Sequence, residues 1–147
     1  MAGFNGDHKL IVGLTWQDED FIELTVQLIT PGWRGIGAAY STARIVREFA
    51  EKLAVFANDS SNAVTFEAGD PGGAPVLTIS LAEYDIGGNV ACRVSLASKD
   101  PLLAYLTQPF ELSAGISTEP TAVDRFSREL ITMLDHPDCW EATLLGE

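Results

Sequence analysis

Apolar and polar residues alternate with a period of two near the start of the chain. The first alternating run contains Leu10, Val12, Leu14 and Trp16. The second run spans residues 22–28 and follows a short polar turn at 17–20. A period of two predicts a β-strand with one buried face. Two such strands joined by a short polar link predict an antiparallel hairpin.

Two later segments carry apolar residues at helical spacing, which predicts two amphipathic helices with one face on the core. The first segment follows Ser41, and the second follows Ser117 or Thr118 and ends at Pro137. A hydroxyl at such a position can accept a hydrogen bond from a free N–H in the first turn. The two apolar stripes are Ile45, Val46, Phe49, Leu53 and Phe56, and Val123, Phe126, Leu130, Met133 and Leu134.

Further strands are predicted on both sides of the first helix. Short apolar alternations predict strands at 63–67, 77–81, 90–96 and 110–116, with one more short strand at 36–40. Residues 101–108 fit either a helical turn or an extended cover. In the tail 138–147, Trp140, Leu144 and Leu145 are expected to pack back onto the core.

The order of these elements predicts an α+β fold in a single domain, residues 1–147. One-sided alternation is typical of antiparallel strands, because strands buried on both faces are continuously apolar. We therefore expect two layers, a mostly antiparallel sheet of about six strands with two helices on one face. The pattern shows no internal repeat. The predicted core is Leu24, Val26, Phe49, Leu53, Leu77, Ile79, Leu81, Val94, Phe126 and Leu130.

The charge balance changes the picture of partners more than that of the fold. Twenty-one Asp and Glu stand against nine Lys and Arg, which gives a net charge of −12. Such a surface repels phosphate backbones and anionic lipid faces, so we expect no nucleic acid and no membrane partner. It attracts a basic protein partner and speeds its capture. The alternative is that the charge only keeps the protein soluble.

Two cysteines, Cys92 and Cys139, do not make a disulfide framework, and we expect both thiols to be free. Residues 1–7 carry no basic region followed by an apolar run, and no stretch approaches the length of a membrane span. The expected compartment is therefore a reducing cytoplasm, most simply a bacterial one.

Motifs for catalysis, cofactors and metals are missing from the sequence. No glycine-rich nucleotide loop, nucleophile elbow or zinc spacing is present, so we expect no cofactor, no metal site and no catalytic residue. If the protein were nevertheless a hydrolase-like enzyme, His8, His136 and Asp135 would be the participants by elimination, because the two histidines are the only neutral-pH bases.

Two segments are candidates for binding. The glycine-rich segment 30–37 presents Trp33 and Arg34, either as a binding loop or as a plain connection whose Trp packs on the core. Asp18, Glu19, Asp20 and Glu23 crowd the turn between the first two strands. These carboxylates form either a solvated hairpin tip or a patch that contacts a basic partner.

Several of these segments resemble small bacterial immunity proteins of polymorphic toxin systems, of the WapI-like type. The similarity covers about residues 21–134. It is carried by Gly35-Ile36-Gly37-Ala38 and Ser41 before a helix with Phe49 and Leu53, by Leu77-Thr78-Ile79-Ser80, by Gly87-Gly88 before Val90, Val94 and Leu96, and by a last helix at 121–134. The resemblance implies a protein that binds and neutralises a toxin domain without catalysis.

The function we expect from the sequence is that of a non-enzymatic protein-binding module. A cytoplasmic immunity protein against a basic toxin domain is its most specific form. One alternative is a structural or regulatory subunit, homodimeric through the sheet face or its edge. The second alternative is the hydrolase-like enzyme above.

Overall fold

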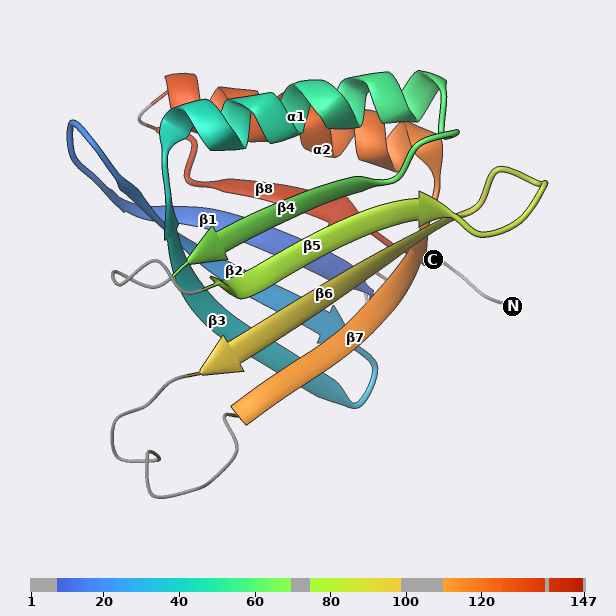
Figure 1. Ribbon diagram of the computed structural model, residues 1–147, viewed down its shortest axis with the longest axis horizontal. Coiled ribbons are helices and arrows are strands. Elements are labelled where there is room, and N and C mark those ends of the chain that lie inside the picture. Colours follow the sequence, from blue (N-terminus) through green and yellow to red (C-terminus); the bar gives the residue numbers. More distant parts are fainter. Residues whose placement is uncertain (1–7, 70–74, 99–109, 137, 147) are drawn as a thin grey trace.

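The computed structural model describes residues 8–69, 75–98, 110–136 and 138–146. Eight strands form one antiparallel sheet in the order β7-β6-β5-β4-β3-β2-β1-β8. Two helices lie side by side across one side of this sheet (Figure 1). The segment 101–108, which the sequence left open, lies outside the described residues. Neither helix in the described ranges is long and apolar enough to cross a membrane.

The chain repeats one order of elements, three strands, a helix and a short strand. The first copy consists of β1 (Lys9–Gln17), β2 (Ile22–Thr30), β3 (Trp33–Ser41), α1 (Ala43–Asn58) and β4 (Val64–Gly69). The second copy consists of β5 (Pro75–Glu83), β6 (Val90–Ser98), β7 (Phe110–Thr118), α2 (Pro120–Asp135) and β8 (Glu141–Leu145). The first three strands of each copy have nine residues and each helix has sixteen.

The repeat extends to individual buried positions of the helices. Ala43 and Pro120 begin α1 and α2, an interval of 77 residues, and the same interval relates every buried residue of one helix to one of the other. The pairs are Val46 and Val123, Phe49 and Phe126, Ala50 and Ser127, Leu53 and Leu130, and Phe56 and Met133. The expectation of no internal repeat is therefore wrong, because the two copies share element order and buried positions, and three of these five pairs are identical residues.

The two copies meet where their equivalent residues touch. The buried Ser127 hydroxyl donates a hydrogen bond of 2.8 Å to the backbone carbonyl of Ala50, its counterpart in α1. A hydroxyl this deeply buried needs a partner, because an unpaired one costs free energy. Small residues at this point let the two helices approach closely.

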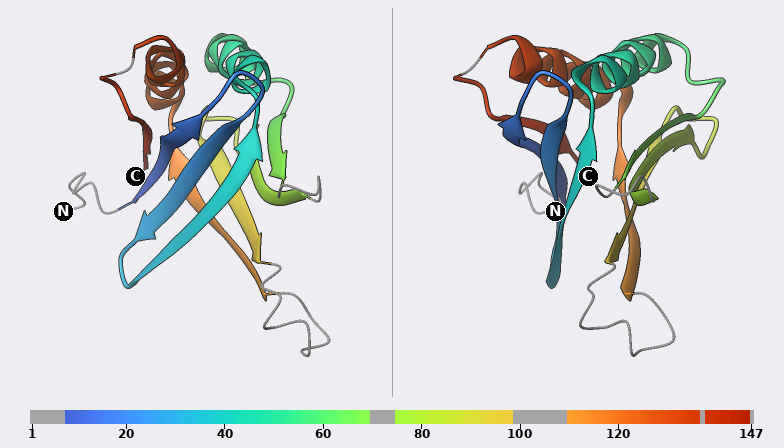
Figure 2. Two further views of the ribbon diagram at one scale, coloured as in Figure 1. Left: turned by 90° about the vertical axis from the view of Figure 1, so that its left-hand side faces the viewer. Right: turned by 60° about the vertical axis from the view of Figure 1, so that its left-hand side comes forward.

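The sheet consists of two four-stranded parts that exchange their short strands. One part is β3-β2-β1-β8 and the other is β7-β6-β5-β4, and a single residue pair, Tyr40 and Gly69, joins β3 to β4. The two parts bend toward each other beneath the helices and splay apart away from them (Figure 2). Gly37 on β3 faces the other part closely, since a Cβ there would lie 2.8 Å from Cδ2 of Leu96 on β6.

The predicted fold class is confirmed as α+β with an antiparallel sheet and two helices, but the sheet has eight strands rather than about six. β3 is longer than the predicted strand 36–40. The prediction was too short because the inward positions of β3 are small residues that show no apolar alternation, and they stand opposite Leu28, Val26, Leu24 and Ile22 of β2. They are Gly35, Gly37, Ala39 and Ser41. The tail forms the five-residue strand β8, in which Leu144 is buried as expected, but Leu145 is 37% exposed and Trp140, just before the strand, is 64% exposed.

All ten residues of the predicted core are buried, with at most 4% of the surface of any of them exposed. The helix boundaries differ from the prediction at both starts. Thr42 rather than Ser41 caps α1, and its hydroxyl accepts a hydrogen bond of 3.1 Å from the Ile45 N–H. Ser117 and Thr118 belong to β7, and α2 begins at Pro120 without a side-chain cap.

Both cysteines are free, as predicted, but their surroundings differ. Cys92 is buried on β6, and burial raises the pKa of its thiol to about 12. Because the thiolate is the reactive form, we expect a thiol reagent at pH 8 to modify Cys139 first. Cys92 should react only after unfolding. Mass spectrometry of native and denatured samples measures this, and equal rates for the two thiols in native protein would contradict the burial of Cys92.

Candidate protein-binding surface

A β-bulge in β1 places Trp16 outside the core. Residues Lys9 to Leu14 pair regularly with β2, but the register then shifts by one residue, so that Trp16 stands opposite Glu23 instead of Ile22. The extra residue moves every later side chain of β1 to the other face of the strand. Trp16 is 49% exposed. Its predicted place in the buried stripe with Leu14 is therefore wrong.

The carboxylate of Asp18 stabilises the turn that follows Trp16. Asp18 Oδ1 accepts hydrogen bonds of 2.8 Å from the backbone N–H groups of Asp20 and Phe21. The bonds from Phe21 and then Asp20 lower the pKa of Asp18 from its ordinary value of 3.8. With the turn fixed in this way, the Phe21 side chain stands 54% exposed at its end.

A second tryptophan adjoins the first from the other end of the chain. The backbone carbonyl of Trp140 accepts a hydrogen bond of 2.8 Å from the Leu14 N–H, which carries the pairing of β1 and β8 one residue beyond β8. Trp140 is 64% exposed. Trp16 and Trp140 line one pocket of about 350 Å³, whose apolar wall includes Leu14 and the buried Met133.

Of the four acidic residues predicted to form a binding patch at this turn, two accept hydrogen bonds within the protein and two do not. Asp18 holds the turn, and Glu23 accepts a hydrogen bond of 2.9 Å from the Thr15 hydroxyl. A hydrogen bond to Glu23 also raises the pKa of Tyr40. Within the described part of the chain, no hydrogen bond or ion pair holds the exposed carboxylates of Glu19 and Asp20. We call Trp16, Glu19, Asp20, Phe21 and Trp140 the aromatic–acidic surface.

The other predicted binding residues, Trp33 and Arg34, follow the opposite end of β2 from the acidic turn. They begin β3 after the turn Pro31-Gly32, where Gly32 has a φ of 95° that favours glycine. Seven residues of β2 separate this turn from Glu23, which is roughly 23 Å of strand. Arg34 is exposed, and the Trp33 side chain lies outside the described part of the structure. The structure therefore does not bring Trp33 and Arg34 to the acidic turn.

The pocket also contains two residues of the enzyme alternative, Asp135 at the end of α2 and His136 directly after it. Cys139 lines the pocket as well, but the Asp135 carboxylate is bound in an ion pair by Arg47 of α1. His8 precedes β1, at the end opposite Trp16, so the two histidines do not meet. Among the described residues, no group of three or more His, Cys, Asp and Glu is arranged to hold a metal ion.

The Arg47–Asp135 pair yields a prediction about titration. The hydrogen bond from Arg47 lowers the pKa of Asp135 below 3.8, and the charges of Arg47 and His136 act in the same direction. Arg47→Ala should therefore raise the titration midpoint of the Asp135 carboxyl, measured by ¹³C NMR. The pair stabilises the fold above the unfolded pKa, and this contribution is lost as pH falls through the folded pKa.

Arg44→Ala is the matched control, because Arg44 pairs with Glu48 on the same helix face and not with Asp135. The Asp135 midpoint should stay unchanged in this variant. An equal upward shift in both variants would mean that the general charge of α1, and not the bond from Arg47, sets the pKa of Asp135.

The equivalent hairpin in the second copy, β5–β6, provides an internal comparison. Asp85 holds its turn as Asp18 does, with Oδ1 accepting from Gly87 N at 2.9 Å, and Tyr84 and Ile86 are exposed. The Tyr84 hydroxyl lies 3.1 Å from Ser117 Oγ, and Glu83 accepts a hydrogen bond from Ser60. This hairpin therefore has exposed apolar residues but no pair of unengaged carboxylates, and Ala63 stands 77 residues before Trp140.

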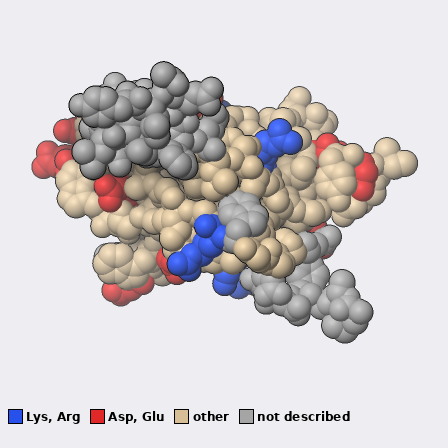
Figure 3. Space-filling model, turned by 90° about the horizontal axis from the view of Figure 1, so that it is seen from below, with Lys and Arg blue, Asp and Glu red and all other residues tan. Residues whose placement is uncertain are grey.

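Figure 3 views the molecule from the side opposite the helices, and acidic side chains gather toward the two ends of the view. Figure 1 places the β1–β2 and β5–β6 hairpins at these ends. Lys and Arg side chains lie on the surface between these ends in this view.

No protein-family model matches the chain, and neither a curated protein nor a solved structure is similar enough to match it.

Proposed function

We propose that the protein is a non-enzymatic protein-binding module that binds a basic protein partner through the aromatic–acidic surface. One observation carries the proposal: Trp16, Phe21 and Trp140 are about half exposed or more, beside two carboxylates that no described residue engages. Exposed aromatic side chains that adjoin an apolar pocket are common at protein interfaces, where Trp is enriched among the residues that dominate affinity.

The chemistry of the surface suits Lys and Arg on the partner. An indole face attracts a cationic side chain, and a guanidinium can stack on it. Glu19 and Asp20 supply charge for such groups without losing a bond inside the protein. The net charge of −12 speeds the encounter, while the aromatic contacts slow dissociation.

The most specific form of the proposal is an immunity protein that neutralises a basic toxin domain in the bacterial cytoplasm. It rests on the sequence resemblance to the WapI-like group and on the negative charge. A toxin domain that acts on nucleic acid carries positive charge to bind phosphates, so an acidic surface is complementary to it. Covering the basic face of such a domain would block its substrate without any catalytic step.

The experiment is capture of partners from an extract of the source cell by immobilised protein. Three forms are compared: wild type, Trp16→Ala/Trp140→Ala, and Tyr84→Ala/Ile86→Ala as the matched control on the equivalent hairpin. We expect a basic protein on wild type and on the control, with less of it on the tryptophan variant. Raising the salt from about 50 to 500 mM should reduce capture, because screening weakens attraction between exposed charges.

Capture of the same proteins by all three forms would contradict the proposal. A partner without net positive charge, or one whose affinity is independent of salt, would contradict the electrostatic part of it. A large toxin gene beside the gene for this protein would support the immunity form.

A further inference from the structure

One edge of the sheet stays open in the first copy of the repeat. β4 pairs with β5 from Val64 to Ala68, but with β3 only where Gly69 meets Tyr40. In an antiparallel strand, every second residue turns its N–H and C=O away from a given neighbour. Between Val64 and Ala68 these outward groups have no strand beside them in the described sheet. Such an edge can accept an added strand.

A groove of about 520 Å³ separates this edge from α1. Its apolar part consists of the buried Phe56 and Val64 and of Val55, which is 68% exposed. Three carboxylates line it against one ammonium group, and these residues are Glu48, Glu51, Asp59 and Lys52. The groove therefore combines apolar surface, negative charge and an open strand edge.

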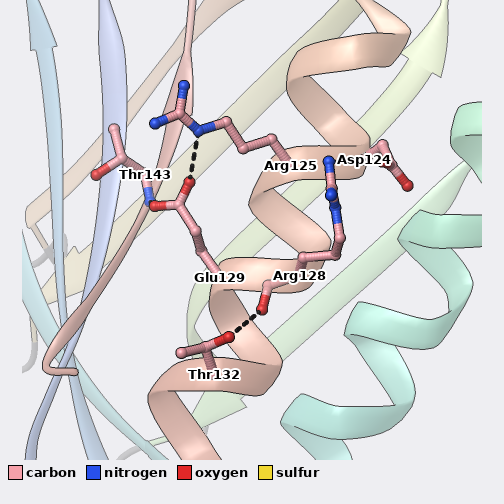
Figure 4. A network of polar contacts seen from close by, with 6 residues as sticks. All are labelled: Asp124, Arg125, Arg128, Glu129, Thr132 and Thr143. Carbon is pink, nitrogen blue, oxygen red and sulfur yellow. Dashed lines mark hydrogen bonds and ion pairs between the residues drawn. The ribbon is translucent and has the colours of Figure 1, made fainter. Parts of the chain in front are cut away.

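The equivalent place in the second copy is closed by a side chain (Figure 4). Glu129 of α2 accepts a hydrogen bond of 3.3 Å from the backbone N–H of Thr143 on β8, and another of 3.2 Å from Arg125. Leu14 and Trp140 form a hydrogen-bonded pair, so the pair of Ile11 and Thr143 three residues away is a non-bonded one, and the Thr143 N–H faces away from β1. Glu129 thus caps the outer edge of β8.

The residue in α1 at the position of Glu129, 77 residues earlier, is Lys52. An ammonium group carries only donors, so Lys52 cannot accept a hydrogen bond from a strand N–H as Glu129 does. The fold is built from the same elements in both copies, yet only one copy caps its outer strand from the helix. The open groove is therefore not a requirement of the fold.

We propose that the groove between α1 and β4 binds an extended segment of another protein, with alternating apolar and basic residues, as an added strand on β4. Backbone hydrogen bonds to β4 would supply affinity, and the alternate side chains would supply selectivity. Apolar side chains would contact Val55 and Phe56, while basic ones would face Glu51 and Asp59. A second copy of this chain fits less well, because each copy carries a charge of −12 and the same carboxylates.

This surface is separate from the aromatic–acidic surface, which is built from the β1–β2 hairpin and the segment before β8. The inference does not depend on the proposed function.

The test uses the whole protein and a capped heptapeptide, Lys-Val-Lys-Val-Lys-Val-Lys, titrated by ¹⁵N NMR at low salt. Two further peptides carry N-methyl groups, one on its valines and the other on its lysines. In an extended strand these two sets of N–H groups face opposite edges. We expect shifts at Thr65 and Glu67, a loss of affinity of at least tenfold for one methylated peptide, and little change for the other.

Equal affinity of all three peptides would overturn the proposal, since charge alone would then explain binding. Absence of binding by the unmethylated peptide at millimolar concentration would also overturn it. So would a homodimer whose dissociation is required before the peptide binds, because the occupant would then be a second copy.

Protein variants locate the binding site. Val55→Arg places a long cationic side chain in the groove and should lower the affinity for the peptide at least tenfold. Thr132→Arg is the matched control, because Thr132 occupies the position of Val55 in α2, 77 residues later. It should leave the affinity unchanged, as should Trp16→Ala/Trp140→Ala. An equal loss of peptide affinity in Val55→Arg and Thr132→Arg would contradict binding in the groove between α1 and β4.

Discussion

Phe126→Ala should lower the free energy of unfolding by about 3–5 kcal/mol, the usual range for truncating a buried Phe. Phe126 is fully buried, and its counterpart Phe49 stacks on Phe66 with ring centroids 4.9 Å apart. Phe49→Ala should therefore cost a similar amount. A domain of this size has a total stability of about 5–15 kcal/mol, so either change removes a large part of it. Equilibrium denaturation in urea measures both values.

Val55→Ala is the control for these variants, because Val55 lies on the exposed face of the same helix as Phe49. Its stability should change by no more than about 0.5 kcal/mol. Losses below about 1 kcal/mol for both phenylalanine variants would mean that the helices do not bury these faces. A large loss for only one of them would mean that the two copies of the repeat contribute unequally to the core.

Trp16→Ala/Trp140→Ala should weaken the complex with the basic partner by at least about 100-fold, because interface tryptophans often contribute 2 kcal/mol or more each. The change should lie mainly in the dissociation rate. Glu19→Gln/Asp20→Asn should instead slow association and reduce the salt dependence, since these exposed carboxylates act at a distance. Surface plasmon resonance at several salt concentrations separates the two effects.

Tyr84→Ala/Ile86→Ala on the equivalent hairpin serves as the control and should leave both rates unchanged. The urea midpoint of each variant checks its folding. The midpoint should stay close to that of wild type, because Trp16 and Trp140 are at least about half exposed and contribute little to the core. A tryptophan variant that binds as wild type does would exclude the aromatic–acidic surface as the binding site.

The helices and most strands were predictable because their apolar residues repeat at a clear period. The stripes of α1 and α2 identified the buried faces, with one exception: Ile45 belongs to the predicted stripe but is 37% exposed. β3 was underestimated because Gly35, Gly37 and Ala39 leave no apolar alternation to detect. Gly37 faces Leu96 of β6, a contact that is remote in sequence.

The candidate surface was predictable only in part. The crowded carboxylates identified the β1–β2 turn, but the pattern could not separate Glu19 and Asp20 from Asp18 and Glu23, whose hydrogen bonds exist only in the folded chain. Trp16 fitted the buried alternation, and nothing in the local sequence marks the bulge that displaces it. Trp140 reaches the hairpin only through the pairing of β8 with β1, a long-range contact.

The internal repeat escaped detection for a related reason. Three of the five buried pairs of the helices are identical, but the other two pairs, Ala50 with Ser127 and Phe56 with Met133, share burial and not residue type. Many apolar residues of suitable size can fill one core position, so the pattern of burial can persist where the letters do not.

The most direct test of the central claim is a hydrogen–deuterium exchange footprint of the complex with its basic partner. Binding through the aromatic–acidic surface should slow exchange in the β1–β2 turn, residues 16–21, and around Trp140. Exchange in the equivalent β5–β6 turn, residues 84–89, should stay unchanged. Protection of the β5–β6 turn or of the outer sheet face, with residues 16–21 exchanging as in the free protein, would contradict the account.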